Sequence, residues 1–562
     1  MLTLGLTDNH DASAALVHDG QVVAACGQER IDRIKNSGAF PWGAMDAVLD
    51  AAGYRYRDVD QVVIGSAFTP SWLLRRFPSL HHQQKDTKGQ FSPLLNAYIV
   101  YQVALRKLKA QGLELRACQH LLERKIRDRG LAPKRVVLLD HHAAHAHSAY
   151  RSQERDSVLV ITLDAMGDGI SATAWRGQGG QLERLFSQSG FAAINTYYSR
   201  VTEYLGFRPN RHEGKITGLA AYTEAPKELK DHFTQQLRFV GPGFSRTNYL
   251  RRQKKDDRFF KVLENFTKEE IAAALQANLE TAVTQLVSHW VERSGQPHVA
   301  VAGGIFANVK LNQRIAELPE VASLWVYPNM GDGGLAAGAA MVGGDVSPTR
   351  MATAYLGPQA SPKDMASALA RAGLPRHKPK DLVNQVAELL AQGKVVAHYD
   401  GATEWGPRAL GNRSLLVRPD DPSINQWLNT RLKRTEFMPF APMVRSCDAS
   451  RFFRGVEKAE QSARFMTVCF DCTDEFKAEA AGVVHVDGTA RPQLLFPEDN
   501  PRLHELIGAF KEKTGLSSLV NTSFNLHEEP IVCTPHDAVR AWDQGQLDAL
   551  VLGPYLVKRD RQ

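Results

Sequence analysis

The chain has 562 residues, of which 43% are hydrophobic and 23% charged, with a formal net charge of +7. This composition is typical of a globular protein with more than one domain, and it excludes low-complexity disorder and collagen-like repeats. Apolar runs such as residues 158–163 are far shorter than the roughly 18 residues that cross a bilayer, and the first residues lack a secretory signal pattern. We therefore expect a cytoplasmic protein that does not span a membrane.

Strands and helices alternate along the chain, which predicts an α/β fold. Residues 1–7 and 21–27 are predicted as two strands that frame the turn His-Asp-Gly, followed by a helix over 41–52 and a strand over 59–66. The same order begins again at residue 158, where the strand VLVITLD leads into a glycine turn and the returning strand ISATAW. Two units that each open on a hairpin predict an internally duplicated domain.

Residues 72–135 form a basic segment that contains 14 Lys or Arg and 4 Asp or Glu. Its net charge is +10, which leaves a net charge of about −3 for the rest of the chain. Nucleic acid could be attracted to such a surface, but no recognised binding motif accompanies it. Helical spacing of apolar residues instead predicts helices with a solvated basic face. The expected apolar stripe consists of Leu105, Leu108, Leu121, Leu122 and Ile126.

The later part of the chain continues the α/β pattern. A long amphipathic helix ending near Gly295 is followed by two units of strand, glycine turn and helix. Residues 346–362 lack periodicity and are rich in Gly, Pro and Ser, so we predict a linker there. The expected domains are therefore residues 1–345 and 363–562.

Cysteine usage gives no sign of a disulfide framework, because six cysteines are scattered over the whole chain. Cys469 and Cys472 form one CxxC motif without a second pair. We predict that both are buried on or beside a strand and do not bind zinc.

Two histidines and two aspartates form a candidate metal site. His141 and His145 are four residues apart, so on a helix their imidazoles project from one face, although this spacing also occurs in ordinary surface or core pairs. Asp164 ends an apolar strand directly before a glycine turn, and Asp332 follows another strand in the same way, where α/β folds place ligand-binding groups. This mixed N/O set suits Fe(II), Mn(II), Zn(II) or Mg(II), and the sequence does not choose among them.

Two glycine turns, each between a predicted strand and a helix, are candidates for nucleotide contact. Such turns let backbone amides approach phosphate, although each alone is more often an ordinary tight turn. Their tandem arrangement beside the predicted metal ligands favours a nucleotide. The residues concerned are Gly303, Gly304, Asn308, Gly331 and Gly333.

Four islands of the C-terminal half combine arginines, including Arg413, with hydroxyl and amide donors. Converging guanidinium groups suit a planar phosphate or carbamate anion, whereas arginines that only bridge surface carboxylates are the alternative interpretation. The candidate anion-binding residues are Arg408, Lys433, Arg434, Arg491, Asn521 and Ser523.

Ten sequence islands cover nearly the whole chain in the order NHDASAAL, QERIDRIKN, DHHAAHAHSAY, LDAMGDG, EGKITGLAAY, GGIFANVKLN, PNMGDGGLAAGAA, EWGPRALGNRS, HVDGTARPQ and NTSFNLHEEPIVCTP. In these islands the sequence resembles the two-domain ATP-dependent O-carbamoyltransferases of antibiotic and nodulation-factor biosynthesis. The resemblance implies a duplicated actin-like (ASKHA, RNase H-like) N-terminal domain. It also implies a C-terminal α/β domain similar to threonylcarbamoyl-adenylate synthases.

The resemblance further implies a reaction at two sites. The C-terminal site would form carbamoyl adenylate from carbamoyl phosphate and ATP, and the N-terminal site would transfer the carbamoyl group to a hydroxyl of a small-molecule acceptor and release AMP. A divalent metal, Fe2+ before Mn2+ or Mg2+, would assist the transfer. The roles it implies are metal binding by His141, His145, Asp164 and Asp332, adenylate contact by Gly303, Gly304 and Asn308, and carbamoyl phosphate contact by Arg408, Arg491 and Ser523.

Two further residues are candidates for catalysis. His10, beside Asp11 in the first hairpin, could remove the acceptor's proton, although a histidine in such a hairpin is often structural. Lys215 in EGKITGLAAY could hold the adenylate or the acceptor, and an ordinary lysine at a helix start is equally consistent with the sequence.

One motif departs from the family pattern. Many members read KxREPFRPFAP where this chain reads LKRTEFMPFAP, so Met438 replaces an arginine and Arg431 or Lys433 is expected to compensate. Residues 72–135 match no family motif, and an anionic acceptor would fit their charge.

Two other functions remain open at this point. The actin-like domain could act as a small-molecule kinase, which would produce ADP without carbamoyl phosphate, or the chain could be a nucleotide-binding scaffold without turnover. A tRNA-modifying enzyme is less consistent with the sequence, which shows no RNA-binding motif. Neither the acceptor nor the oligomeric state follows from the sequence.

Overall fold

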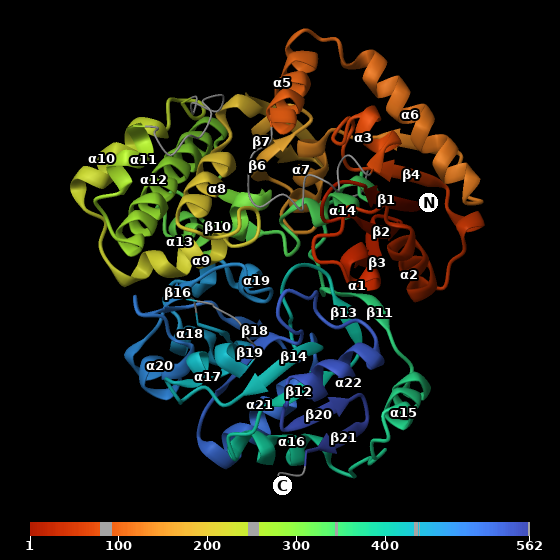
Figure 1. Ribbon diagram of the computed structural model, residues 1–562, viewed down its shortest axis with the longest axis vertical. Helices are drawn as coiled ribbons and strands as arrows, with labels where there is room; N and C mark the ends of the chain where they lie inside the picture. The colour runs from red at the N-terminus through yellow and green to blue at the C-terminus, as the bar shows by residue number, and fades with distance from the viewer. Residues whose placement is uncertain (79–92, 246–257, 343–346, 432–436, 438, 560–562) are drawn as a thin grey trace. The chain divides into compact units, whose positions relative to one another are not determined.

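The computed structural model describes residues 1–78, 93–245, 258–342, 347–431, 437 and 439–559 (Figure 1). The chain divides into two compact units. Unit 1 contains Met1–Val23, Gly38–Pro41 and Tyr54–Arg350, and unit 2 contains Ala24–Ser37, Trp42–Gly53 and Met351–Gln562.

Unit 2 therefore includes a part of the chain that the sequence places in the N-terminal domain. Within this unit, Arg33 donates hydrogen bonds to the carbonyl oxygens of Pro530 (2.8 Å) and Ile531 (2.7 Å). Such contacts between distant parts of the chain leave no trace in local composition.

Unit 1 is built on two five-stranded sheets with orders β3-β2-β1-β4-β5 and β8-β7-β6-β9-β10, of which β3 continues into the residues assigned to unit 2. In each sheet the third strand in this order pairs antiparallel with the second and parallel with the fourth. The predicted duplication and actin-like fold are thereby confirmed. The strands are β1 (Leu2–Thr7), β2 (Ser13–His18), β3 (Gln21–Gly27), β4 (Gln61–Ile64), β5 (Arg135–Leu138), β6 (Val158–Gly167), β7 (Ile170–Gln178), β8 (Gln181–Ser189), β9 (His298–Ala302) and β10 (Ser323–Val326).

The first hairpin differs from the prediction, which omitted β2. This strand pairs antiparallel with β1 along its length, and the turn His18-Asp19-Gly20 joins β2 to β3. The sequence SAALVH contains two alanines, which have little preference for strands, so tertiary burial decides its conformation.

Helices flank these sheets where the sequence predicts them. The long helix α12 begins with a capping box between Thr267 and Glu270 and ends at Gly295, which adopts a left-handed conformation (φ 69°). The principal helices of unit 1 are α5 (Pro93–Lys107), α6 (Gln111–Asp128), α7 (His141–Arg151), α8 (Ile194–Tyr204), α9 (Glu213–Leu219), α10 (Lys227–Gln236), α12 (Lys268–Ser294), α13 (Val309–Ala316) and α14 (Leu335–Ala340).

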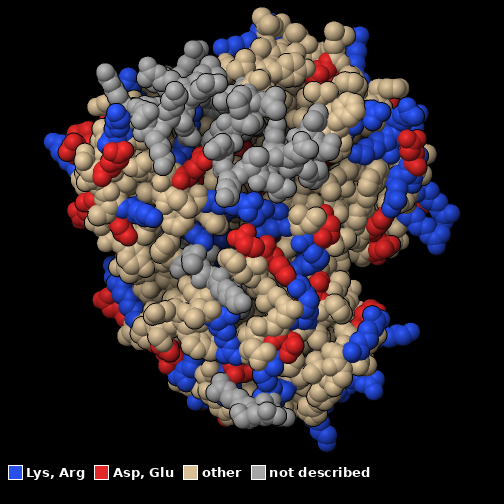
Figure 2. Space-filling model, in the orientation of Figure 1, with Lys and Arg blue, Asp and Glu red and all other residues tan. Residues whose placement is uncertain are grey.

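The basic segment forms helices as predicted, but its apolar stripe is partly different. Helix α6 buries Cys118, Leu122 and Ile126 at intervals of four residues, and Figure 2 shows Lys and Arg side chains along the edge that α6 forms. Leu108 is wrongly assigned to the stripe, because α5 ends at Lys107 and the Leu108 side chain is 76% exposed.

Close packing of α14 brings the candidate metal ligands together. A β-carbon at Gly338 would overlap the carbonyl oxygen of Ala144 in α7, and one at Gly5 in β1 would overlap the carbonyl oxygen of Ala336. Glycine at these two positions therefore lets α14 lie directly against both elements. Asp332, just before α14, is thereby held beside the start of α7.

Unit 2 is built on a seven-stranded mixed sheet of order β18-β15-β19-β14-β12-β20-β21, which confirms the predicted α/β class of the C-terminal half. Its strands are β12 (Val396–Tyr399), β14 (Arg413–Val417), β15 (Ala441–Arg445), β18 (Gln493–Leu495), β19 (Ser518–Ser523), β20 (Ala549–Leu552) and β21 (Tyr555–Lys558). The principal helices are α2 (Trp42–Ala52), α15 (Pro362–Arg371), α16 (Leu382–Ala391), α17 (Ile424–Arg431), α21 (Pro501–Thr514) and α22 (Pro535–Gln544).

Smaller features complete unit 2. Within the predicted linker, β11 (Tyr355–Gln359) pairs antiparallel with β13 (Ala402–Glu404). Cys469 and Cys472 are buried on either side of β16 (Phe470–Asp471), as predicted. In neither unit does the described part of the chain include a helix long and apolar enough to cross a membrane.

Candidate metal centre and anion site

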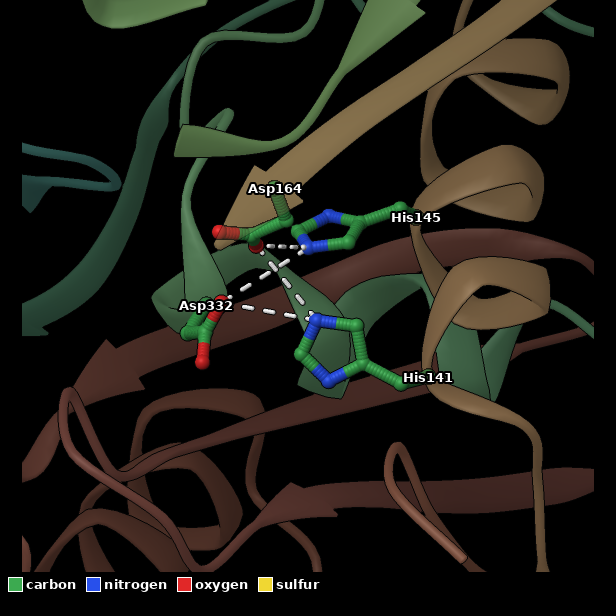
Figure 3. Close-up of side chains that lie close together, drawn as sticks. All are labelled: His141, His145, Asp164 and Asp332. Carbon is green, nitrogen blue, oxygen red and sulfur yellow. Dashed lines mark hydrogen bonds and ion pairs between the residues drawn. The ribbon is translucent and has the colours of Figure 1, made fainter. Parts of the chain in front are cut away.

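The four side chains that the sequence predicts as metal ligands meet inside unit 1 (Figure 3). His141 and His145 project from α7, Asp164 from β6, and Asp332 from the short turn Asp332–Gly334 before α14. All four are buried, and one ligand atom of each lies within 4.8 Å of the others. Segments far apart in the sequence thus form one cluster.

Local sequence explains how α7 presents its histidines. Asp140 caps the helix, since its carboxylate accepts a hydrogen bond from the backbone N–H of Ala143 (3.1 Å). The carboxylate of Asp168 accepts another from the backbone N–H of His141 (2.9 Å). A β-carbon at Gly167, the last residue of β6, would overlap the imidazole of His141, so glycine at this position makes room for the histidine.

The ligand atoms lie close enough together to hold one cation. His145 Nε2 lies 3.1 Å from Asp164 Oδ2 and 3.7 Å from Asp332 Oδ1, and His141 Nε2 lies 3.4 and 3.6 Å from the same two oxygens. A metal ion bound at about 2.0–2.2 Å by nitrogen and oxygen ligands separates neighbouring ligand atoms by roughly 3 Å. The donor set and its spacing therefore fit a divalent metal ion such as Fe(II), Mn(II) or Zn(II).

Opposite charges at the cluster shift the pKa values of its members. Burial opposes protonation of His141, but the carboxylates of Asp332 and Asp164 outweigh burial and raise its pKa to about 9. Burial likewise disfavours the charged form of Asp164, yet hydrogen bonds from His141 and His145 hold its pKa well below the usual range. The site therefore favours an anionic Asp164 opposed by the positive charge of a protonated His141.

Hydrogen bonds from neighbouring side chains fix the orientation of the candidate metal ligands. These contacts were not predicted from the sequence. Ser66 Oγ lies 2.8 Å from Nδ1 of His141, so this ring presents Nε2 to the cluster. The Asn9 amide donates to Oδ2 of Asp332 (2.8 Å), which leaves Oδ1 facing the histidines. Among the described residues, Nδ1 of His145 has no hydrogen-bond partner. Outer contacts of this kind are typical of metal sites.

The two predicted catalytic residues differ in position. His10 is 54% exposed and borders the cluster, with Nε2 3.3 Å from Asp332 Oδ2 and Nδ1 3.0 Å from Asp11 Oδ2. Lys215 is buried in α9, which packs against α8 and α12.

The first glycine turn lies directly beside the metal cluster. Gly303 (φ 113°) follows β9 and donates its backbone N–H to Met330 (2.6 Å), which joins this turn to the one that carries Asp332. A β-carbon at Gly304 would lie 3.3 Å from Asp164 Oδ1. The predicted nucleotide-contacting backbone and the predicted metal ligands are therefore neighbours.

The remaining predicted nucleotide residues lie on the same two turns. Asn308 caps α13 and exchanges hydrogen bonds with the amide of Gln276 (2.8 and 3.1 Å). Gly331 and Gly333 flank Asp332, and a β-carbon at Gly331 would meet no atom within 4 Å.

In unit 2 one asparagine joins three of the predicted anion-binding islands. Asn521 on β19 donates its amide to the carbonyl oxygen of Ala409 (3.2 Å) and to Oε1 of Gln493 (2.7 Å). Ala409 follows Arg408, and Gln493 lies two residues after Arg491. The half-buried Arg408 and Arg491 are therefore carried on loops held beside β19, which also contains Ser523.

Arg413 does not act with the other guanidinium groups, contrary to the prediction. It is fully buried, stacks 3.7 Å over the ring of Tyr399 and donates to the carbonyl oxygens of Asp400 (2.6 Å) and Gly401 (2.9 Å). Arg413 thus stabilises a turn.

Arg431 lies in the last turn of α17, 4.7 Å over the ring of Trp427, and donates to the carbonyl oxygen of Gly545 (3.2 Å). Lys433, Arg434 and Met438 lie outside the described residues.

Unit 1 is a duplicated actin-like fold with a buried centre of two imidazoles and two carboxylates that could hold a metal ion. Family models identify the chain further: "Carbamoyltransferase N-terminus" matches residues 2–341 and "Carbamoyltransferase C-terminus" matches residues 387–559. The chain belongs to the carbamoyltransferase family, as the sequence islands predicted, and the family supports a transferase.

Similar proteins include a nodulation protein and a cephem O-carbamoyltransferase. Nodulation protein NolNO of Sinorhizobium fredii is 31% identical over 585 residues, covering 99% of this chain and 80% of the relative. The 3'-hydroxymethylcephem-O-carbamoyltransferase of Streptomyces clavuligerus is 28% identical over 365 residues, covering 63% and 66%. Among solved structures, T. kodakarensis HypF matches with a TM-score of 0.31 and 14% identity over 61% of this chain and 47% of that one.

Proposed function

We propose that the protein is an ATP-dependent O-carbamoyltransferase that acts through carbamoyl adenylate on a hydroxyl of a small-molecule natural product. The observation that carries this proposal is a buried cluster of two histidines and two aspartates in a chain whose two halves both match the carbamoyltransferase family. The names of the cephem and nodulation relatives support an O-linked acceptor and a natural-product context. Use of ATP is consistent with a cytoplasmic protein.

In the proposal, the C-terminal half forms the activated donor. Carbamoyl phosphate, ATP and one water yield carbamoyl adenylate, phosphate and pyrophosphate. Arg408, Arg491 and Ser523 bind the carbamoyl phosphate, Asn521 holds the islands that carry them, and Lys433 and Arg434 add positive charge. Guanidinium groups suit this task because they bind phosphate oxygens through paired hydrogen bonds.

Transfer takes place in the N-terminal half, where the acceptor oxygen forms a bond to the carbamoyl carbon and AMP leaves. In the proposal, Nδ1–H of His10 donates to Asp11 (3.0 Å) and Nε2 accepts the proton of the acceptor hydroxyl. The imidazolium formed is stabilised by Asp332, whose Oδ2 lies 3.3 Å from Nε2. Such proton transfer contributes a factor of about 10² to 10⁴. Lys215 supports the adenylate or the acceptor.

The adenylate is held by the glycine turns beside the metal cluster. The predicted contacts are Gly303, Gly304, Asn308, Gly331 and Gly333. His141, His145, Asp164 and Asp332 would hold a divalent ion, Fe2+ first, which would stabilise negative charge that develops on the carbamoyl or phosphate oxygens.

A product assay tests the proposal. We expect the purified protein to convert ATP to AMP and pyrophosphate only when carbamoyl phosphate is present, and to pass labelled carbamoyl to a hydroxyl metabolite of a mixed pool. Formation of ADP without carbamoyl phosphate would indicate a kinase instead, and the absence of any nucleotide product would indicate a scaffold.

Metal affinity should depend on pH. Because the pKa of metal-free His141 is about 9, this imidazole is protonated at neutral pH and must lose a proton to bind a metal ion. We expect affinity for Mn2+ to rise by about tenfold per pH unit between pH 6.5 and 8.5 and to level off above pH 9. Titration calorimetry in buffers of different ionisation enthalpy should detect the released proton, whereas a pH-independent affinity would contradict the assignment.

A further inference from the structure

We propose that Arg75, which lies in the basic segment outside every family motif, is a positioning residue of the metal centre. The inference rests on the proposed metal-dependent transfer in unit 1. Arg75 is in helix α3 (Trp72–Arg76), and its side chain is only 2% exposed. A guanidinium group so far from solvent requires partners for its donors.

Arg75 is bonded to two loops at the same time. Its Nε and Nη2 donate to the two carboxylate oxygens of Asp8 at 2.9 and 3.0 Å. Its Nη1 donates to the carbonyl oxygen of Ala67, and Nη2 donates also to that of Ser66, both at 2.9 Å. One buried side chain therefore ties the loop after β1 to the loop after β4.

The loop after β1 controls one carboxylate ligand. Asp8 is followed directly by Asn9, whose amide donates to Oδ2 of Asp332 (2.8 Å), and by His10, whose Nε2 lies 3.3 Å from the same oxygen. These contacts occupy the oxygen of Asp332 that faces away from the histidines. A displacement of Asp8 would therefore rotate or release Asp332.

The loop after β4 controls one imidazole ligand. Ser66 offers Oγ to Nδ1 of His141 at 2.8 Å, and its own carbonyl oxygen accepts from Arg75. The Asp168 carboxylate holds the next residues, because it accepts from the backbone N–H groups of Ala67 and Phe68 at 2.9 Å. Arg75 thus acts on two of the four ligands through Asp8 and Ser66.

The contact pattern requires arginine. Lysine carries the same charge, but its single nitrogen cannot match a carboxylate with two parallel hydrogen bonds and also reach two carbonyl oxygens. A buried ion pair is weak evidence for stability by itself, because desolvation offsets the attraction. The role that we assign to the Arg75–Asp8 pair is therefore to orient the metal ligands.

The test compares Arg75→Lys, Arg75→Met and the double variant Asp8→Asn/Arg75→Met in the full chain. Mn2+ affinity is measured by titration calorimetry, and unfolding is followed by circular dichroism. We expect each Arg75 variant to bind Mn2+ about 10- to 100-fold more weakly than the wild type, as for other outer contacts of metal sites. The double variant Asp8→Asn/Arg75→Met removes both charges of the buried pair and so leaves no unpaired buried charge. It should stay folded and also bind Mn2+ about 10- to 100-fold more weakly. If the single Arg75 variants do not fold, the double variant decides.

Arg464 in unit 2 provides the matched control, since it is equally buried (3%) and paired with Asp499. Arg464→Met should lower the unfolding temperature without changing the Mn2+ affinity of the folded protein. Wild-type affinity in folded Arg75→Lys, or in the double variant where the single Arg75 variants fail to fold, would overturn the positioning role alone. Absence of Mn2+ binding by the wild type would overturn the proposed metal centre and this inference with it.

Discussion

Replacement of His145 by alanine is expected to weaken Mn2+ binding by about 100-fold or more and to abolish carbamoyl transfer, while formation of carbamoyl adenylate continues. His145 Nε2 lies between Asp164 and Asp332 at 3.1 and 3.7 Å, so its loss removes one of the four donors. Replacement of a residue that only hydrogen-bonds to a metal ligand commonly lowers metal affinity about 10- to 100-fold. Loss of a direct ligand should therefore lower the affinity at least as much. Pyrophosphate release and transfer of labelled carbamoyl measure the two steps separately.

His142 supplies the control for this experiment. It is buried in the same helix, but its ring nitrogens contact Thr162 Oγ1 (2.7 Å) and the carbonyl oxygen of Ile170 (3.0 Å). His142→Gln should therefore lower stability and still bind one Mn2+ ion per chain. Unchanged Mn2+ affinity in folded His145→Ala would show that the cluster is not the metal site.

The sequence predicts the candidate ligands because each has a local signal. His141 and His145 share a helix face through their spacing. Asp164 lies near the end of the apolar strand β6, and Asp332 follows the apolar strand β10. The structure brings them together because the duplicated sheets and the close approach of α14 to α7 place these segments side by side.

The contacts around the ligands have no such signal. Ser66 is an ordinary residue after a strand, and Arg75 is one of many basic residues in its segment, until folding puts the first on His141 and the second on Asp8. The missed strand β2 has the same cause, since its conformation depends on burial between neighbours. Arg413 is the opposite case. Its motif makes it a candidate for anion binding, but its guanidinium group donates to the backbone carbonyl oxygen of Asp400.

Replacement of Arg491 by alanine should separate the two reactions in the opposite way. We expect formation of carbamoyl adenylate to fall by about 100-fold or more, because the proposal assigns to Arg491 charged hydrogen bonds to the phosphate that alanine cannot make. Transfer from carbamoyl adenylate supplied to the variant should proceed at the wild-type rate. Arg491→Lys, which keeps the charge but not the paired donors, should fall between the alanine variant and the wild type.

Arg540 is a suitable control because it is a half-buried arginine of the same unit that pairs with Glu529 at 2.6 and 2.8 Å. Its replacement by alanine should leave both steps unchanged. Equal loss of both steps in folded Arg491→Ala would contradict the division of labour, since a residue that binds only the carbamoyl phosphate has no contact with the acceptor reaction. A selective loss of the first step would place the activation chemistry at the loops joined by Asn521.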